Sequence, residues 1–448
     1  MNSMKSSSAG NYIKRPELEG LRVLYGIFCF FIIASIVMPQ YFGVHIGYDI
    51  TCARLSNMLI LGYMLLNQKV LSHFVTTSLQ CEIVVPMLMY LFVAAYTMVF
   101  RTDINAFFLV FLEVLSLFML IYGIRYVIGY KRAIRFVIGC AYFLGIYGLV
   151  EFAYGRSLFL QFFRTVPTAV VNSYRSGHYR IMGSCGHPLA FGLVLLLFIA
   201  IACLDVEKNE IYLFKRPVLL LVLLVDVFLT GSRSTLGIAA VEVVVIILLS
   251  NRNNRIRSIF YGCVAFFCFV LFLLLFHSTG AGQYIMGQIM SLVDQLLGTS
   301  YAAKYGVDIT TLQNSEGYRD ALPYIFTLDW LNPFIGRGSH FGGAEINGVF
   351  VQSIDNYYVL QYIKYAYPGL VSYVLFMIVT VVVAVKHVIR NKSAVTKVLL
   401  IGMFFYFFNL WWVDELQTLK YVYVYVAIFY AHYLEDKFCM KKQALSEA

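Results

Sequence analysis

The sequence predicts an all-α polytopic membrane protein with about 12 transmembrane helices, on the basis of three observations. Of its 448 residues, 60% are hydrophobic and only 13% are charged, and the mean hydropathy is +0.75, a balance that soluble globular domains do not have. Apolar runs of about twenty residues, the length that crosses the hydrocarbon core of a bilayer, recur along the chain. Short basic clusters lie between these runs, as they do in the cytoplasmic connections of membrane proteins.

Twelve apolar runs are the predicted spans. They cover residues 21–38, 42–67, 82–100, 104–124, 133–152, 187–204, 217–231, 234–249, 258–277, 357–385, 398–412 and 421–434. Asp49 and Arg54 interrupt the second run, and the tenth is expected to break at Tyr367-Pro368-Gly369, because proline removes a helical hydrogen bond. The predicted order is a cytoplasmic tail (1–20), nine spans (21–277), a large extracytoplasmic loop (278–355), three spans (356–434) and a second cytoplasmic tail (435–448).

The distribution of charge predicts the orientation of these spans. With twelve of them, the dense basic clusters within 125–135, 208–216, 252–257 and 386–397 lie on the side of both termini, which the positive-inside rule assigns to the cytoplasm. The other face carries mainly arginine, whose planar guanidinium suits two-pronged contact with phosphate. The net charge of +10 therefore lies in membrane connections, and no nucleic-acid partner is expected. The nine cysteines form no CxxC pair, so neither a metal site nor a disulfide framework is predicted.

The first candidate site is the stretch that opens the predicted sixth span, Tyr179-Arg-Ile-Met-Gly-Ser-Cys-Gly-His-Pro188. Its glycines allow a tight backbone path, and proline suits the first position of a helix. Arg180 is expected just above the helix N-terminus, where backbone N–H groups also favour an anion. The alternative is interfacial: Arg180 extends to lipid headgroups and His187 caps the helix, with a catalytic role for His187 as a further possibility.

The second candidate is Thr230-Gly-Ser-Arg-Ser-Thr235, at the tip of the predicted hairpin between two short spans. Its hydroxyls suit either phosphate oxygens or a helix cap. Short spans would draw Arg233 below the plane of the headgroups into a cavity. The alternative is a plain polar turn, with Arg233 in the headgroup layer.

The third candidate is the long loop. Residues 283–297 predict an amphipathic helix that lies on the membrane or on the protein's own spans, and residues 317–330 predict a second helix, carrying Arg319. Gly336-Arg337-Gly338 is a basic turn, followed by His340. Asp355-Asn356-Tyr357 opens the tenth span, where Asp355 either accepts a proton from a sugar hydroxyl or caps the helix.

These stretches together resemble the Wzy polymerase / O-antigen ligase superfamily of bacterial membrane proteins. The resemblance rests on Arg180-x-x-Gly183, on Thr230-Gly-Ser-Arg-Ser234, on Arg319, on Ile335-Gly-Arg-Gly338 and on the Asp355-Asn356-Tyr-x-x-Leu entry to the next span, in that order between residues 179 and 373. The first five spans match in hydropathy alone.

The resemblance implies an inverting, GT-C-type glycosyltransferase of the bacterial inner membrane, with its active site on the extracytoplasmic face. Such enzymes polymerise undecaprenyl-pyrophosphate-linked oligosaccharides into capsule, O-antigen or exopolysaccharide, without a metal cofactor, beside a flippase and a chain-length regulator. Arg180, Arg233 and Arg319 match the arginines thought to hold the pyrophosphate, and Arg337 is a fourth candidate. Ligases carry a loop histidine where this chain has Asp355-Asn356, so the predicted base is Asp355 or a displaced His340.

Three other functions stay open at this stage. Transfer of a finished glycan to a lipid or cell-wall acceptor, as in O-antigen ligases, uses the same chemistry. A twelve-span flippase or transporter is disfavoured because the two halves of the sequence show no repeat and the long loop has no counterpart in the first half. A structural subunit would not require clustered outward arginines.

Overall fold

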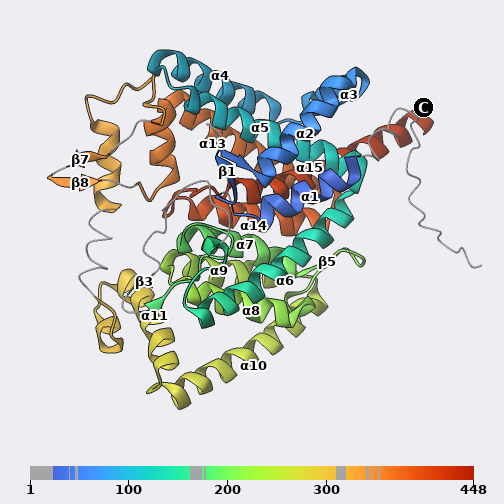
Figure 1. Cartoon of the computed structure of the whole chain (residues 1–448). Helices are drawn as coiled ribbons and strands as arrows, with labels where there is room; N and C mark the ends of the chain where they lie inside the picture. Colours follow the sequence, from blue (N-terminus) through green and yellow to red (C-terminus); the bar gives the residue numbers. More distant parts are fainter. Residues whose placement is uncertain are drawn as a thin grey trace, which may run out of the picture.

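The computed structural model describes residues 24–39, 41–45, 49–161, 174–175, 178–308, 319–339, 343–346, 348–351 and 354–447. Helices make up nearly all of the regular structure, which confirms the all-α prediction (Figure 1). They are α1 (Tyr25–Ile36), α2 (Cys52–Leu66), α3 (Gln68–Leu79), α4 (Val84–Arg101), α5 (Ile104–Gly123), α6 (Tyr130–Tyr154), α7 (Pro188–Ala202), α8 (Pro217–Leu229), α9 (Arg233–Leu249), α10 (Arg252–Phe276), α11 (Gly280–Leu297), α13 (Tyr357–Asn391), α14 (Ala394–Asn409) and α15 (Leu419–Glu447).

Within the described residues, short antiparallel hairpins connect some of these helices. The strand pairs are β1 (Gly43–His45) with β2 (Asp49–Thr51), β3 (Tyr174–Arg175) with β4 (His178–Tyr179), β5 (Leu204–Asp205) with β6 (Glu210–Ile211), and β7 (Ala344–Ile346) with β8 (Val349–Val351). The β1–β2 hairpin corrects the prediction of a second span from residue 42. The backbone of 43–45 pairs with that of 49–51, and helix α2 begins only at Cys52, where the Thr51 side chain caps it by accepting from the Arg54 N–H.

Five helices are long and apolar enough to cross a membrane: α4, α5 with its π-helical extension to Ile128, α6, α10 and α13. A sixth span is possible if α2 and α3, which bend by 115° at Asn67, cross together. The chain is therefore a membrane protein. The count of twelve remains a prediction, because α1, α7, α8 and α14 are apolar but shorter than the five long helices. The orientation of the termini also remains a prediction.

The core is built around α7. Fourteen of its fifteen residues are buried, and it packs against α8, α9 and α14. A helix that is apolar on every side belongs in such a central position. Helix α10 is the opposite case, because Ser258 is its one buried residue and it runs along the edge of the molecule (Figure 1). An apolar surface that other helices leave uncovered suits contact with lipid.

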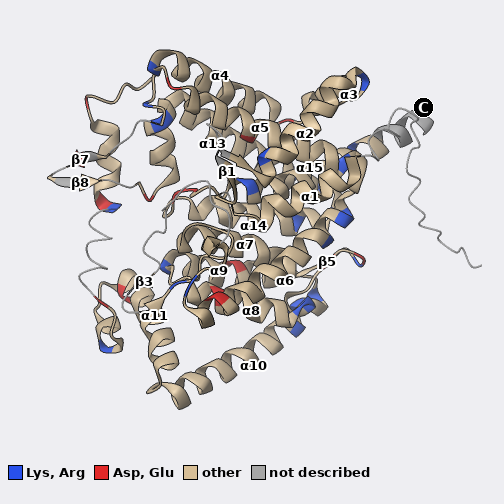
Figure 2. Cartoon of the chain, viewed as in Figure 1, with Lys and Arg blue, Asp and Glu red and all other residues tan. Residues whose placement is uncertain are grey.

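Charged residues avoid the middle of most helices. Figure 2 shows tan ribbons through the interior, with many Lys and Arg positions gathered at the right of the view, around the far part of α15 and near β5. Red positions inside the bundle lie beside α8 and α9. Three buried carboxylates occupy this interior, on Glu151, Asp226 and Glu242, each 0% exposed.

The tenth predicted span breaks where expected. Ala366 has φ 54° and ψ −165°, two residues before Pro368, so α13 consists of two helical pieces. The break exposes backbone carbonyls, and the turn at Gly336 satisfies two of them. Arg337 N–H donates to Ile363 O (2.8 Å) and Gly338 N–H donates to Lys364 O (2.9 Å). The predicted basic turn therefore stabilises the break in α13, because its backbone N–H groups bind the free carbonyls there.

In the long loop one predicted helix is confirmed, and the other is confirmed over part of its length. Helix α11 covers the predicted amphipathic helix. Of the predicted helix over 317–330, the described residues 319–321 are α-helical, and Leu322–Thr327 continue as a 3-10 helix that ends before Trp330. Pro323 lies inside that stretch and cannot donate to a helical carbonyl. Arg319 lies in the α-helical part of this segment, as predicted.

We expect Gly336→Val to destabilise the protein. A Cβ at this position would lie 2.0 Å from the Lys364 carbonyl oxygen, in backbone that cannot give way. The expected loss is about 1–3 kcal/mol, typical of overpacking. Thermal unfolding in detergent measures it, with Gly139→Ala as the matched control, because nothing lies within 4 Å of a Cβ there. Equal melting temperatures for both variants would contradict the close contact between the Gly336 turn and α13.

Candidate functional site

A buried carboxylate holds the loop that carries Arg180. Glu151, in the last turn of α6, accepts hydrogen bonds from the Tyr179 hydroxyl (2.7 Å) and from the N–H groups of Met182 (3.0 Å) and Gly183 (2.9 Å). Three donors on one buried carboxylate fix the backbone on both sides of Arg180. Sequence analysis did not identify Glu151, because nothing in its local pattern shows that it faces a loop about thirty residues later.

The glycine of the Arg180-x-x-Gly183 motif is required by geometry. Gly183 has φ +56°, in the left-handed region. A Cβ there would lie 2.4 Å from the Phe191 ring, which belongs to the first turns of α7. The loop therefore lies directly on the central helix.

Arg180 reaches across to the second motif. Its side chain is 8% exposed, and its Nε donates to Thr230 O over 2.7 Å. The guanidinium runs along Gly231, where a Cβ would lie 3.1 Å from Nε, and Ile181 N–H donates to Leu229 O over 3.1 Å. The structure thus brings together two motifs that are about fifty residues apart.

Arg233 starts α9, immediately after this turn. Ser232 is the N-cap and its side chain accepts from Thr235 N–H, which fixes the turn where it joins α9. Arg233 is 7% exposed and lines a cavity of about 360 Å³, together with Arg319 from the long loop. We call this space the arginine cavity. Its described lining consists of Leu189, Gly231, Ser232, Arg233, Ser234, Gly237, Ile238, Leu292, Gln295, Leu296, Arg319 and Trp412.

Helix α11 covers the same turn from the outside. Leu292, Gln295 and Leu296 form one wall of the arginine cavity, and the Tyr284 hydroxyl donates to Phe228 O over 3.1 Å. Burial raises the pKa of Tyr284 to about 12, while the nearby positive charge of Arg180 opposes the rise. The amphipathic helix of the loop therefore packs, in part, on the protein's own α8–α9 turn.

Arg319 faces the predicted base. The distance from Arg319 Nη2 to Asp355 Oδ2 is 4.0 Å. Among the described residues, Arg319 Nε is buried and has no hydrogen-bond partner, so the guanidinium retains a donor. Asp355 does not cap α13: Asn356 does so, accepting from Tyr358 N–H (3.0 Å) and Val359 N–H (3.1 Å). The capping interpretation of Asp355 is therefore wrong, and its carboxylate faces Arg319 instead.

The other predicted residues have different positions. Arg337 does not line the arginine cavity in the described structure; its guanidinium lies over the Trp330 ring, 4.6 Å from the centroid. Tyr357 is fully buried, with its ring 5.2 Å from that of Tyr373, and so is part of the core. His187 caps α7, its Nδ1 accepting from Leu189 N–H over 3.1 Å, as the capping interpretation expected. His340 lies outside the described residues.

A second and larger cavity, of about 490 Å³, has His187 in its lining. We call it the charged cavity, because three carboxylates and three cations line it. They are Glu113, Asp414, Glu415, Arg54, Lys364 and Lys420. Tyr41, Tyr423 and Asn57 add polar and aromatic surface. Sequence analysis missed Asp414 and Glu415, although adjacent acidic residues between two apolar runs were a visible signal.

Asp355 interacts electrostatically with one residue of each cavity, Arg319 and Asp414. Burial raises the pKa of Asp414 to about 7, the negative charge of Glu415 adds to the rise, Lys364 opposes it, and Asp355 contributes a further small rise. Burial likewise raises the pKa of Glu415 to about 7, with Glu113 adding to it and Lys364 opposing it. Asp355 thus acts electrostatically on the charged cavity, whose carboxyl groups have raised pKa values, while its carboxylate faces Arg319 of the arginine cavity.

Glu151→Leu is expected to unfold the Arg180 loop. The change removes the acceptor of three hydrogen bonds and leaves two backbone N–H groups buried without a partner, each costing about 1–3 kcal/mol. Thermal unfolding in detergent should show a large drop, and the matched control Glu210→Leu, on a connecting strand, should show a small one. An unchanged melting temperature for Glu151→Leu would contradict its role.

Stability should depend on pH through Glu415. The folded state holds this proton more tightly than the unfolded chain, so the stabilisation is complete below about pH 4.5 and is lost as pH rises through about 7. The melting temperature in detergent should therefore fall between pH 5 and pH 8, and Glu415→Gln should make that fall shallower. Glu345→Gln, an exposed carboxylate, is the control. Parallel pH curves for all three proteins would refute the assignment.

Comparison with known proteins adds no relative to this picture. No family model matches the chain, and no curated protein matches it. The likeness to the Wzy polymerase / O-antigen ligase superfamily thus rests on the motifs between residues 179 and 373, and any function has to be argued from the site.

Proposed function

We propose that this protein is a membrane glycosyltransferase of the GT-C type that polymerises undecaprenyl-pyrophosphate-linked oligosaccharide repeats into capsule, O-antigen or exopolysaccharide. One observation carries the proposal. Arg233 and Arg319 line a single cavity, and Arg180 lies against Gly231 in its wall. Three guanidiniums from separate stretches of sequence therefore gather around one turn.

A lipid-linked pyrophosphate fits such a cavity. Its two phosphates carry several negative charges, which fixed guanidiniums neutralise through charge-assisted hydrogen bonds. Arg319 Nε, buried without a described partner, is a donor that a phosphate oxygen would satisfy. The hydroxyl groups of Ser232 and Ser234 are further donors in the lining. Because the cations are already in place, they stabilise the charge that develops as pyrophosphate leaves.

The charged cavity suits the acceptor glycan. Its mixture of carboxylates, cations and tyrosines offers both acceptors and donors to sugar hydroxyls. In the proposed step an acceptor hydroxyl oxygen attacks the anomeric carbon of the donor sugar, and the bond from that carbon to the pyrophosphate oxygen breaks. The pyrophosphate keeps the electron pair and remains on the lipid, while the hydroxyl proton passes to a carboxylate. Asp355 is our proposed base because its carboxylate faces Arg319 of the arginine cavity and acts electrostatically on Asp414 of the charged cavity.

The proposal includes the setting implied by the resemblance. The enzyme would work on the extracytoplasmic face of the bacterial inner membrane, with both termini cytoplasmic and with a flippase and a chain-length regulator as partners. Polymerisation is preferred to ligation because Asp355-Asn356 stands where ligases have a histidine.

Removing single charges tests the proposal in a strain that depends on this protein for polymer. We expect Arg180→Gln, Arg233→Gln and Arg319→Gln each to lower polymer yield by about 100-fold, since loss of one donor to developing charge costs about 2.7–4 kcal/mol. Lipid-linked single repeats should accumulate, as measured by mass spectrometry. Arg156→Gln, an exposed arginine stacked on Tyr154, is the matched control.

Two results would count against the proposal. Normal polymer from all three variants, at membrane levels equal to wild type, would exclude the glycosyltransferase function. Accumulation of finished polymer still attached to its lipid carrier would instead identify the protein as a ligase.

A further inference from the structure

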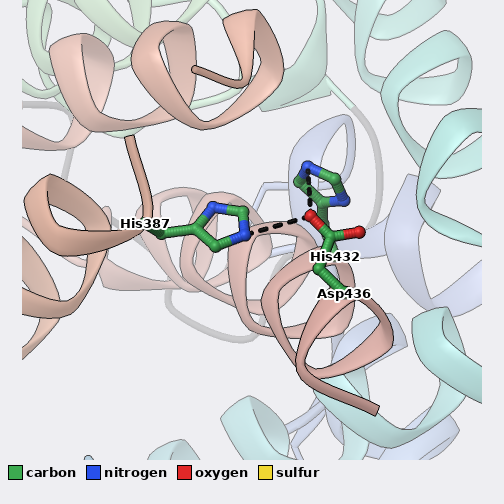
Figure 3. A group of neighbouring side chains, drawn as sticks. All are labelled: His387, His432 and Asp436. Carbon is green, nitrogen blue, oxygen red and sulfur yellow. Dashed lines mark hydrogen bonds and ion pairs between the residues drawn. The ribbon is translucent and has the colours of Figure 1, made fainter. Parts of the chain in front are cut away.

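Two histidines and an aspartate meet at the end of the protein remote from Asp355. His387 lies near the C-terminal end of α13, whose first residue follows Asn356, while His432 and Asp436 are one turn apart on α15. Figure 3 shows both imidazole rings directed at the Asp436 carboxylate. The two helices are brought together at this point by side chains forty-five residues or more apart in sequence.

The spacing of the three groups is close to that of a metal centre. His387 Nε2 lies 3.0 Å from Asp436 Oδ2, and His432 Nε2 lies 3.8 Å from the same oxygen. All three donor atoms lie within 4.8 Å of one another. Tetrahedral zinc, with bonds of about 2.1 Å, holds its ligands about 3.4 Å apart. Adjustments of about 1.4 Å or less would therefore bring the donors to zinc-binding positions.

Packing and hydrogen bonds fix the two histidine rings in orientations that suit metal binding. Their exposed fractions are 3% for His387 and 6% for His432, so both rings are held by packing. His387 Nδ1 lies 2.8 Å from Thr396 Oγ1, which leaves Nε2 directed at the aspartate. Metal-bound histidines commonly use their second nitrogen in this way. Ser393 Oγ, 3.0 Å from His432 Nε2, is a further polar group within reach.

The chemistry of the donors selects the ion. Two imidazole nitrogens and a carboxylate suit zinc and related divalent transition metals, whereas calcium and magnesium prefer oxygen ligands throughout. Both nitrogens face one carboxylate oxygen, and the Asn391 amide nitrogen lies 2.9 Å from His387 Nε2 and 3.2 Å from Asp436 Oδ2, so a bound metal ion would displace this amide. The positive charge of Lys131 near His432 opposes a metal, and the negative charge of Glu435 near Asp436 favours one.

We propose that His387, His432 and Asp436 bind one zinc ion, which ties α13 to α15. The role is structural, and it is independent of the proposed glycosyl transfer and of the expectation that transfer needs no metal. Sequence analysis predicted no metal site, because these ligands follow no short-range spacing pattern across two helices.

Zinc binding tests the proposal on full-length protein in detergent, purified without a polyhistidine tag and stripped with a chelator. After zinc addition and removal of excess, elemental analysis should find one zinc per chain in wild type and in His178→Gln, a control with an exposed histidine remote from these helices. His432→Gln and Asp436→Asn should bind at least 10-fold more weakly. Zinc should raise the melting temperature of wild type and control but not of the two variants.

Cobalt substitution gives an independent measurement on wild type alone. Cobalt bound by two imidazoles and a carboxylate in a tetrahedral site should produce strong visible absorption, which zinc should then displace. This result stands even if a variant fails to fold. Absence of stoichiometric zinc from wild type, or equal binding by the two variants and wild type, would overturn the proposal and leave a hydrogen-bonded cluster of His387, Asn391 and Asp436.

Discussion

The hydrogen bond from Arg180 to the carbonyl of Thr230 joins the two halves of the candidate site, and much of the surrounding structure maintains it. Glu151 fixes the loop on one side, through three donors, and Ser232 fixes the turn on the other. Gly183 and Gly231 allow the two backbones to approach, since a side chain at either position would meet a ring or a guanidinium. Because these contacts fix the backbone, the positive charges of Arg180 and Arg233 can lie close to the same turn.

A guanidinium in so buried a position is costly unless it is satisfied, and the structure reduces the cost with backbone carbonyls. Arg101, at the end of α4, is also satisfied by a backbone carbonyl: its Nε donates to Gly336 O of the long loop over 2.7 Å. Arg319 differs, because its described contacts are an aspartate at 4.0 Å and a cavity. That difference makes Arg319 the cation most available to a ligand in our proposal.

The two ends of α13 have contrasting roles. Its first piece carries the contacts with the loop and adjoins Asp355, and the break at Ala366 leaves carbonyls that the Gly336 turn uses. Its last turns carry His387, packed with α15. Contacts therefore hold α13 near both of its ends. A helix held in this way suits a cavity that must keep a charged group in one position.

Hydropathy and local pattern determined much of this protein by themselves. The apolar runs at α4 to α10, the amphipathic α11, the glycine at 183 and the break before Pro368 all follow from forces that act over a few residues, namely burial, backbone conformation and helical hydrogen bonding. Only the tertiary structure decided the rest. It assigned the cap to Asn356 and not to Asp355, placed Arg337 on Trp330, replaced part of the second predicted span with a hairpin, and gathered Glu113, Asp414 and Glu415 around one cavity. These outcomes depend on which distant segments pack together, and the free energy of such contacts leaves no periodic mark in the sequence.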